Sequence, residues 1–403
     1  MILSLALVFL GGLSAAALLR RIGLPPVIGM LAAGIIIGPN ALNLLDTSVI
    51  EISSDLRRIA LIIILLRAGL SLNVSDFKKV GRPAVLLSFV PAVFETAAYV
   101  LLAPPLLGMS RIEAAVLGAV LAAVSPAIVV PRMLKLIKEG YGTNKCIPQM
   151  LMAGASCDDV FVIVLFSAFT GMAQSGTVNA AKFADVPVSI ALGIAAGIGC
   201  GAFLALLLNK AHERGKGIND STIQAVIMFG IAFLLASIEN AAEKHVAFSG
   251  LLAVMSMACI FKMKSPKRVT EELARILEKT WTAAEIVLFV LVGAAVDVKS
   301  TAAVGAGAIC VIVGALVMRS VGVLICLIGS GLNAKEKLFC TVAYIPKATV
   351  QAAIGSMPLA MGLPCGNTVL AVAVLGILIT APLGAAAVDR TYDKLLKGSG
   401  DAS

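Results

Sequence analysis

Apolar stretches follow one another along almost the whole chain, separated by short polar, glycine-rich or proline-rich breaks. Each stretch runs for roughly 17 to 27 residues, which is the length that a helix needs to cross the hydrocarbon core of a bilayer. The pattern predicts an all-α membrane protein with thirteen transmembrane helices, which begin near Ile2, Pro25, Leu56, Pro83, Ile112, Ile147, Val186, Ser221, Val246, Thr280, Ala302, Lys337 and Thr368.

The distribution of basic residues supports this number of spans. When the intervening loops are assigned alternately to two sides, 23 of the 32 Lys and Arg residues fall on one side and six on the other. Loops rich in Lys and Arg stay in the cytoplasm, so the N-terminus is predicted outside and the C-terminus inside a cell membrane. The remaining three basic residues, Arg67, Arg319 and Lys347, lie inside or at the edge of spans.

Composition narrows the class further. Hydrophobic residues make up 59% of the chain and charged residues 14%, with a mean hydropathy of +1.01, which excludes an ordinary soluble globule. The net charge of +9 is explained by basic cytoplasmic loops, so no nucleic-acid partner is predicted. The eight cysteines show no CxxC spacing, and His212 and His245 lie far from any ligand set. No cofactor, no structural metal site and no ATP-binding loop is expected.

Two halves of the chain resemble each other. The segment 68–74, AGLSLNV, parallels the segment 292–298, VGAAVDV, and a proline interrupts a span at Ser125-Pro126 and again at Ile345-Pro346. Spans one to six then correspond to spans eight to thirteen, and a shift of seven spans inverts the topology. Inverted six-helix repeats with crossed discontinuous helices are typical of secondary transporters. Chance similarity among Gly/Ala-rich helices could explain the short segments, but it does not explain the paired breaks.

Two adjacent acids, Asp158 and Asp159, lie inside an apolar run. A carboxylate at membrane depth is costly unless it is paired or protonated, and the alternative is a helix end at the membrane surface. A rise of about 1.5 Å per residue places this pair, Glu95, Arg319 and Lys347 at similar depths, about 15 to 20 Å from the cytoplasmic side. The common depth disfavours the surface alternative and predicts a buried ion site.

The two breaks supply further groups for this site. Pro126 and Pro131 remove backbone donors and free carbonyls, and Pro346 does the same in the opposite repeat. Irregular backbone at membrane depth is tolerated where it lines a polar cavity. We therefore expect the Ser125 hydroxyl, unless it bonds back to its own helix, to bind a small hard cation together with the freed carbonyls, Asp158 and Asp159.

Each charged group has a predicted task. Crowded carboxylates away from water hold protons more tightly, so cation and proton are expected to compete for the two aspartates. Lys347 places a positive charge against the carbonyl end of a half-helix. Arg319 keeps its proton and serves as a structural counter-charge. Its partner is either Glu95 or Asp158, and the sequence leaves both open.

Several motifs resemble those of the sodium/proton antiporters of the cation:proton antiporter superfamily, most closely its NHA branch. They cover nearly the whole chain: Pro25-Pro26-Val27-Ile28-Gly29, Gly38-Pro39-Asn40, Val124-Ser125-Pro126-Ala127, Asp158-Asp159, Arg319, and residues 346–355, PKATVQAAIG. The resemblance implies that Asp159 is the acid common to the superfamily and that Asp158 is its partner. Ser156, in the same run, is also predicted to belong to the ion site. The resemblance also implies that Glu95 pairs with Arg319. Electrogenic bacterial members have a lysine in place of Arg319, so electroneutral exchange is expected.

The resemblance further implies a division into domains. A core ion-transport domain (82–173 and 301–392) is expected to move against a dimerisation domain (1–75 and 220–299), with 185–210 as a linker helix. The expected protein is a homodimer in the lipid bilayer that exchanges Na⁺ or Li⁺ for H⁺ by an elevator-type motion and is not an enzyme. Alternatives are a sodium-coupled symporter of an organic anion, a channel, and an intramembrane aspartyl protease. The last needs aspartates on different helices, whereas adjacent residues of one helix point about 100° apart.

Overall fold

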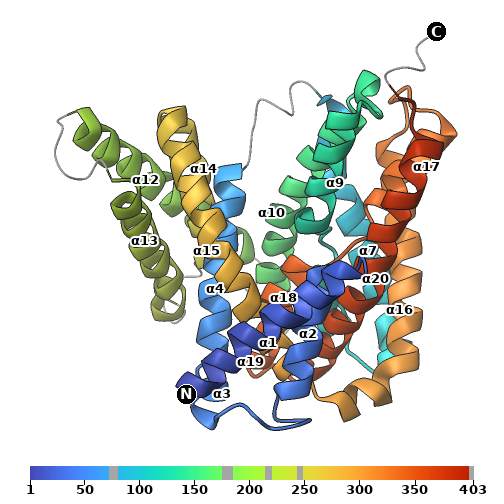
Figure 1. Cartoon of the computed structure of the whole chain (residues 1–403), viewed down its shortest axis with the longest axis horizontal. Helices are drawn as coiled ribbons and strands as arrows, with labels where there is room; N and C mark the ends of the chain where they lie inside the picture. Colours follow the sequence, from blue (N-terminus) through green and yellow to red (C-terminus); the bar gives the residue numbers. More distant parts are fainter. Residues whose placement is uncertain (72–79, 175–184, 214–219, 243–247, 399–403) are drawn as a thin grey trace. The chain divides into compact units, whose positions relative to one another are not determined.

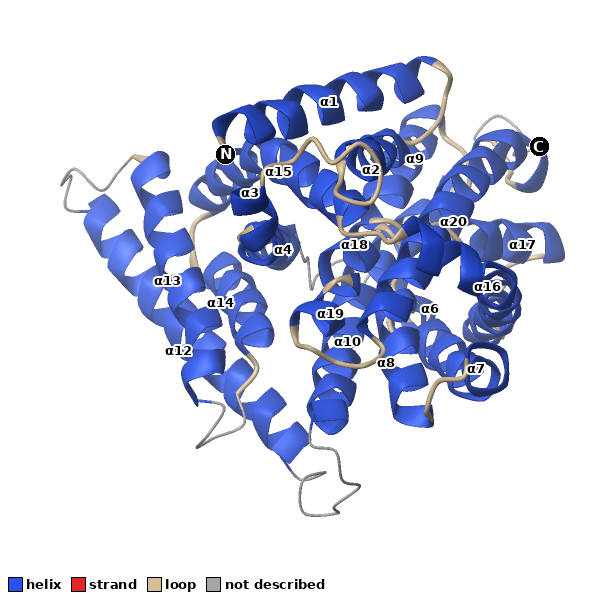
Figure 2. Ribbon diagram, turned by 90° about the horizontal axis from the view of Figure 1, so that it is seen from below, coloured by secondary structure: helices blue, strands red, loops and turns tan. Residues whose placement is uncertain are grey.

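Every regular element in the described part of the chain is a helix (Figure 2). The computed structural model describes residues 1–71, 80–174, 185–213, 220–242 and 248–398. Some residues used in the sequence analysis lie outside these ranges. They are the end of the first repeat segment (72–74), His245, and six basic residues that were counted for the orientation: Lys78, Lys79, Lys182, Arg214, Lys216 and Lys244.

The first half of the chain contains α1 (Ile2–Arg21), α2 (Pro26–Ile37), α3 (Thr47–Glu51), α4 (Ser53–Ser71), α6 (Arg82–Leu87), α7 (Val90–Leu107), α8 (Arg111–Leu121), α9 (Pro126–Glu139) and α10 (Ile147–Gln174).

The second half continues without a strand in its described residues. It contains α12 (Asp185–Glu213), α13 (Ser221–Ala242), α14 (Gly250–Lys264), α15 (Lys267–Ala294), α16 (Val298–Cys326), α17 (Ala334–Ala343), α18 (Thr349–Gly355), α19 (Met357–Ala360) and α20 (Gly366–Leu395). Eight segments among the described residues are long and apolar enough to cross a membrane, and α2 is apolar but shorter, with 12 residues. The chain is therefore a multi-pass membrane protein. The number of thirteen spans and the inverted topology stay predictions.

The chain divides into two compact units. Unit 1 comprises Met1–Ser54, Asn73–Phe169 and Phe289–Ser403, and unit 2 comprises Asp55–Leu72 and Thr170–Leu288. All the residues predicted for the ion site belong to unit 1. The predicted core, linker and dimerisation domains stay predictions.

Close helix packing in unit 1 brings the charged positions together. The helix α16 runs beside α7 (Figure 1), and α7 runs beside α8 (Figure 2). A Cβ atom at Gly322 of α16 would lie 2.9 Å from the Cα atom of Pro91 in α7, and one at Gly118 of α8 would lie 3.0 Å from the Cα atom of Thr96. Glycine thus permits contacts between helix backbones on both sides of α7, which carries Glu95.

Unit 2 shows the same kind of packing. In α12, Gly193, Gly197 and Gly201 face the backbone carbonyls of Ser249, Ala253 and Met257 along α14, at distances that leave no room for a side chain. Small residues at a spacing of four place one face of a helix directly against its neighbour. These glycines therefore serve packing within unit 2.

Two local expectations differ from the structure. The basic stretch before Thr280, expected as a loop, is helical from Lys267, because this segment is rich in the helix-forming residues Glu, Lys, Arg and Leu. Hydropathy identifies only the apolar part of such a helix. The span expected from Pro83 is divided into α6 and α7 at Ser88 and Phe89, where Pro91 has no N–H to continue the helical bonding.

Candidate functional site

The two proline-containing interruptions touch each other. Residues 122–125 separate α8 from α9, and residues 344–348 separate α17 from α18. The backbone N–H of Ser125 donates a hydrogen bond of 2.8 Å to the carbonyl of Pro346. A Cβ atom at Gly384 of α20 would collide with the Pro346 ring, so α20 packs directly against the second interruption. Both breaks expected from Pro126 and Pro346 are present, and they meet at one point.

Pro131 does not break a helix. It lies inside α9, which continues to Glu139. A proline within a helix removes one internal hydrogen bond and can bend the helix without ending it. By contrast, Pro126 begins α9, where the missing N–H would have no partner in any case.

Three consecutive carbonyls at the end of α8 accept hydrogen bonds from the second half of the chain. Lys347 Nζ donates to Leu121, Arg319 Nη1 donates to Ala122, and Gln351 Nε2 donates to Ala123 at 2.7 Å. The last carbonyls of a helix have no partner inside the helix and carry partial negative charge, which suits cationic donors. Pro126 frees the carbonyl of Ala122, four residues earlier, so this carbonyl, expected from the sequence to help bind a cation, is already occupied by a side chain.

Arg319 contacts both of the acids that the sequence left as alternatives. Its Nη1 lies 2.7 Å from Glu95 Oε2, and its Nη2 lies 3.1 Å from Asp158 Oδ2. The Asp158 Oδ2 atom also accepts a hydrogen bond of 2.8 Å from the backbone N–H of Val124. The planar, forked guanidinium makes this double pairing possible.

Lys347 forms an ion pair that sequence reasoning missed. Its Nζ lies 2.7 Å from Glu95 Oε1, and both side chains are fully buried. The similar predicted depth of Lys347 and Glu95 was a signal for this contact, but depth alone does not show which helices are neighbours. Glu95, Asp158, Arg319 and Lys347 therefore form a group of two carboxylates and two cations, called here the paired cluster.

Asp159 differs from its neighbour. It is 6% exposed, and its Oδ1 atom has no hydrogen-bond partner among the described residues. Among the residues that the structure describes, no cation lies within ion-pair distance of Asp159. Adjacent residues on a helix point about 100° apart, so α10 directs Asp158 into the paired cluster and Asp159 away from it. Ser156 is half-buried on α10 and, three residues before Asp159, lies on the same face.

Around the paired cluster, several oxygen atoms have no hydrogen-bond partner within the part of the chain that the structure describes. They include Asp158 Oδ1, Asp159 Oδ1 and the hydroxyl of Ser125, which is fully buried and does not bond back to its own helix. Carboxylate and hydroxyl oxygens are ligands that small hard cations prefer. Within the described residues, no three His, Cys, Asp or Glu side chains form a metal-binding group. The oxygens of Asp158, Asp159 and Ser125 are therefore of the kind that a small hard cation takes as ligands.

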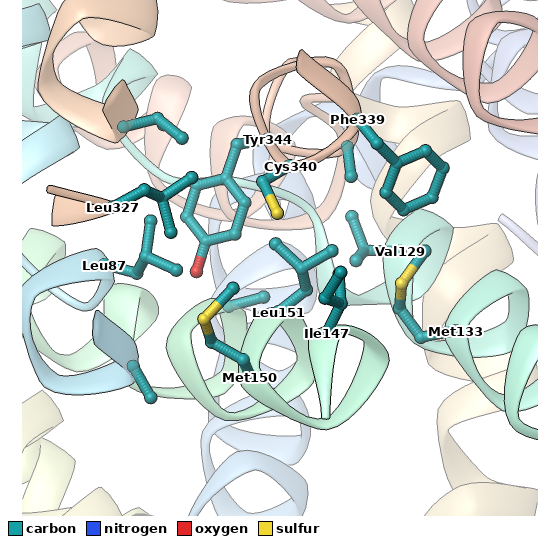
Figure 3. Close-up of a cluster of buried hydrophobic side chains, with 14 of the residues drawn as sticks. Leu87, Val129, Met133, Ile147, Met150, Leu151, Leu327, Phe339, Cys340 and Tyr344 are labelled. Atoms are coloured by element: carbon teal, nitrogen blue, oxygen red, sulfur yellow. The ribbon is translucent and has the colours of Figure 1, made fainter. Parts of the chain in front are cut away.

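A layer of apolar side chains covers one side of the cluster. Tyr344 accepts a hydrogen bond of 2.7 Å from Arg319 Nε through its carbonyl, and its ring lies 5.5 Å from the guanidinium carbon. Figure 3 shows this ring among Leu87, Met150 and Leu327, which belong to a larger buried cluster. A Cβ atom at Gly154 would collide with the Tyr344 hydroxyl. Tyr344 therefore contacts both the Arg319 guanidinium of the paired cluster and the buried apolar side chains around it.

Two helix interruptions that touch each other beside buried acids in a multi-pass membrane protein are typical of secondary ion transporters. The fold matches that of a solved structure, the sodium proton antiporter MjNhaP1 from Methanocaldococcus jannaschii, with a TM-score of 0.82 and 22% identity over 98% of each chain. The family model "Sodium/hydrogen exchanger, transmembrane" matches residues 5–389.

Relatives agree with this match. Sodium/hydrogen exchanger 9B2 of Xenopus tropicalis is 36% identical over 93% of this chain and 70% of its own length. The human protein of the same name is 35% identical with the same coverage, and human sodium/hydrogen exchanger 9B1 is 30% identical over 94% of this chain and 74% of its own. The chain belongs to the sodium/hydrogen exchanger family. It is a cation/proton antiporter and not an enzyme.

Proposed function

We propose that this protein exchanges Na⁺ or Li⁺ for H⁺, with cation and proton taking turns on Asp159. Asp158 Oδ1 and the Ser125 hydroxyl complete the cation site, and Ser156 lies beside it. The observation that carries the proposal is that Asp159 is a buried carboxylate without a counter-charge in the described part of the chain. An uncompensated carboxylate at membrane depth is unfavourable, and it becomes favourable when either a proton or a metal cation binds.

The charge balance supports electroneutral exchange. The two cations of the paired cluster neutralise its two carboxylates, so the site with Asp159 carries one excess negative charge. One proton or one monovalent cation neutralises this charge equally well. The loaded site then crosses the membrane with no net charge in either direction, and the exchange is one for one.

The hydrogen bonds of the cluster support an elevator-type motion of the core. Arg319 and Lys347 tie α7, α8, α10 and the 344–348 segment into one network. Breaking this network would leave charges buried without partners, so these elements move together. In this proposal the core (82–173 and 301–392) carries the ion past the dimerisation domain of a homodimer. The protein lies in a cell membrane with its N-terminus outside and its C-terminus inside.

The proposal is tested in proteoliposomes that contain the purified full chain. A Na⁺ gradient should drive a pH change in the lumen, and Asp159→Asn should abolish it, because an asparagine amide neither carries the proton nor balances the cation charge. The matched control is Asp393→Asn, the same chemical change at an exposed position of α20, which should keep the activity of the wild-type protein. Unchanged exchange in Asp159→Asn contradicts the proposal.

A further inference from the structure

One peptide unit lies between Gln351 and Asp158. The carbonyl of Ala123 accepts a hydrogen bond of 2.7 Å from Gln351 Nε2, and the N–H of Val124 donates one of 2.8 Å to Asp158 Oδ2. These two groups belong to the same peptide bond, which is planar and rigid. A displacement of the carbonyl therefore displaces the N–H as well. Through this unit, α18 holds a carboxylate on α10.

The orientation of the Gln351 amide is fixed by its neighbours. Its Nε2 atom lies 2.7 Å from the carbonyl oxygen of Ala123 and 3.5 Å from that of Leu121. A carbonyl oxygen only accepts hydrogen bonds, so the amino group must face these atoms and the amide oxygen must face away. The side chain is fully buried. The Gln351 amino group therefore donates its hydrogen bond to the segment between α8 and α9, and its amide cannot be turned round.

Gln351 also differs from the other two donors to these carbonyls. Lys347 and Arg319 are held by ion pairs with Glu95 as well as by the carbonyls of α8. Gln351 carries no charge and adds nothing to the charge balance of the cluster. The hydrogen bond to Ala123 is consequently the contribution of Gln351 that bears on Asp158.

We propose that Gln351 is a positioning residue for cation binding: it holds the Ala123–Val124 peptide so that Asp158 presents its Oδ1 atom to the cation. This inference rests on the proposed function of the aspartate pair. Residues 122–125 lie outside the helices, so the peptide turns about its flanking single bonds once the Ala123 hydrogen bond is lost. Discrimination between cations of different size depends on the spacing and rigidity of the oxygen ligands. Gln351 therefore sets the affinity for Na⁺ relative to Li⁺.

The test is a set of Na⁺ and Li⁺ titrations in proteoliposomes that contain the full chain with Gln351→Met or Gln351→Leu. Methionine has nearly the same length without a donor, and leucine is a shorter side chain without a donor; neither adds a charge to the cluster. We expect the apparent KM for Na⁺ to rise by about five- to tenfold, the effect of losing one hydrogen bond. The maximal rate should stay within about twofold of the wild-type rate, and the ratio of the KM values for Li⁺ and Na⁺ should move toward one.

Thr349→Val is the matched control. Thr349 is buried on the same short helix, and its hydroxyl has no hydrogen-bond partner in the described ranges of the chain, so this variant should keep the wild-type KM values. The proposal is overturned if the Gln351 variants keep these values, or if they lose rate with KM unchanged. It is equally overturned if both Gln351 variants fail to give monodisperse protein while Thr349→Val succeeds, since Gln351 is then a folding residue.

The outcome for the proposed function is read separately. If the wild-type protein shows no Na⁺-driven exchange, or if Asp159→Asn retains it, the proposed function fails whatever the Gln351 variants do. If Asp159→Asn is inactive and the Gln351 variants behave as the wild-type protein does, only the inference about Gln351 fails.

Discussion

The paired cluster and Asp159 lie next to each other in unit 1 but differ in kind. Glu95 is buried with a cation 2.7 Å from each of its carboxylate oxygens, whereas Asp159, almost as buried, has no cation at such a distance in the described residues. Burial alone therefore does not distinguish a structural acid from a transporting one. The partner does: removing a paired carboxylate leaves a buried cation uncompensated, whereas an unpaired carboxylate is available to bind an ion.

The largest expected effect is a difference in the free energy of unfolding between variants in which Glu95 and Asp159 are neutralised separately. Glu95→Gln leaves two buried cations facing Asp158 alone, and we expect a loss of about 3 to 5 kcal/mol, the usual cost of breaking a buried ion pair. Asp159→Asn removes no hydrogen bond or ion pair, so its stability should change by less than about 1 kcal/mol. Unfolding midpoints in one detergent measure both. Equal destabilisation of the two variants would contradict the distinction.

A smaller effect is expected at Asp158, which belongs to the paired cluster and, in the proposed function, also offers an oxygen to the cation. In Asp158→Asn the cluster keeps two cations for one carboxylate, so the excess positive charge attracts Asp159 and weakens cation binding. We expect the apparent KM for Na⁺ to rise at least about tenfold, equivalent to about 1.4 kcal/mol. Sodium titrations of exchange in proteoliposomes measure this, with Asp393→Asn as the control. A KM equal to that of the wild-type protein would show that Asp158 acts only in structure.

The fold was predictable where a single physical requirement governed the sequence. Apolar length predicted thirteen spans, and eight segments of the described residues are long and apolar enough to cross a membrane. The prolines at 126 and 346 located both interruptions because they lack an N–H donor. The division between α6 and α7 was not predicted, since Pro91 was read as part of one apolar run. The helical start of α15 at Lys267 was also missed, because hydropathy does not detect a charged helix outside the membrane.

The site was predictable as a set of residues but not as a set of contacts. Depth along each helix placed Glu95, Arg319, Lys347 and the aspartates together, because the rise per residue is constant. The partner of each charge depends on helix rotation and side-chain reach, so the Lys347–Glu95 pair and the double pairing of Arg319 required the structure. The role of Gln351 depends on a single peptide orientation, which no sequence pattern encodes.

The central claim is that the paired cluster is internally neutral and that Asp159 alone carries the exchanged charge. The most direct test compares the initial rate of the Na⁺-driven pH change in proteoliposomes with and without an imposed membrane potential. A cycle that moves one cation against one proton transfers no net charge, so the account predicts the same rate in both conditions. A rate that increases or decreases with the potential would contradict it.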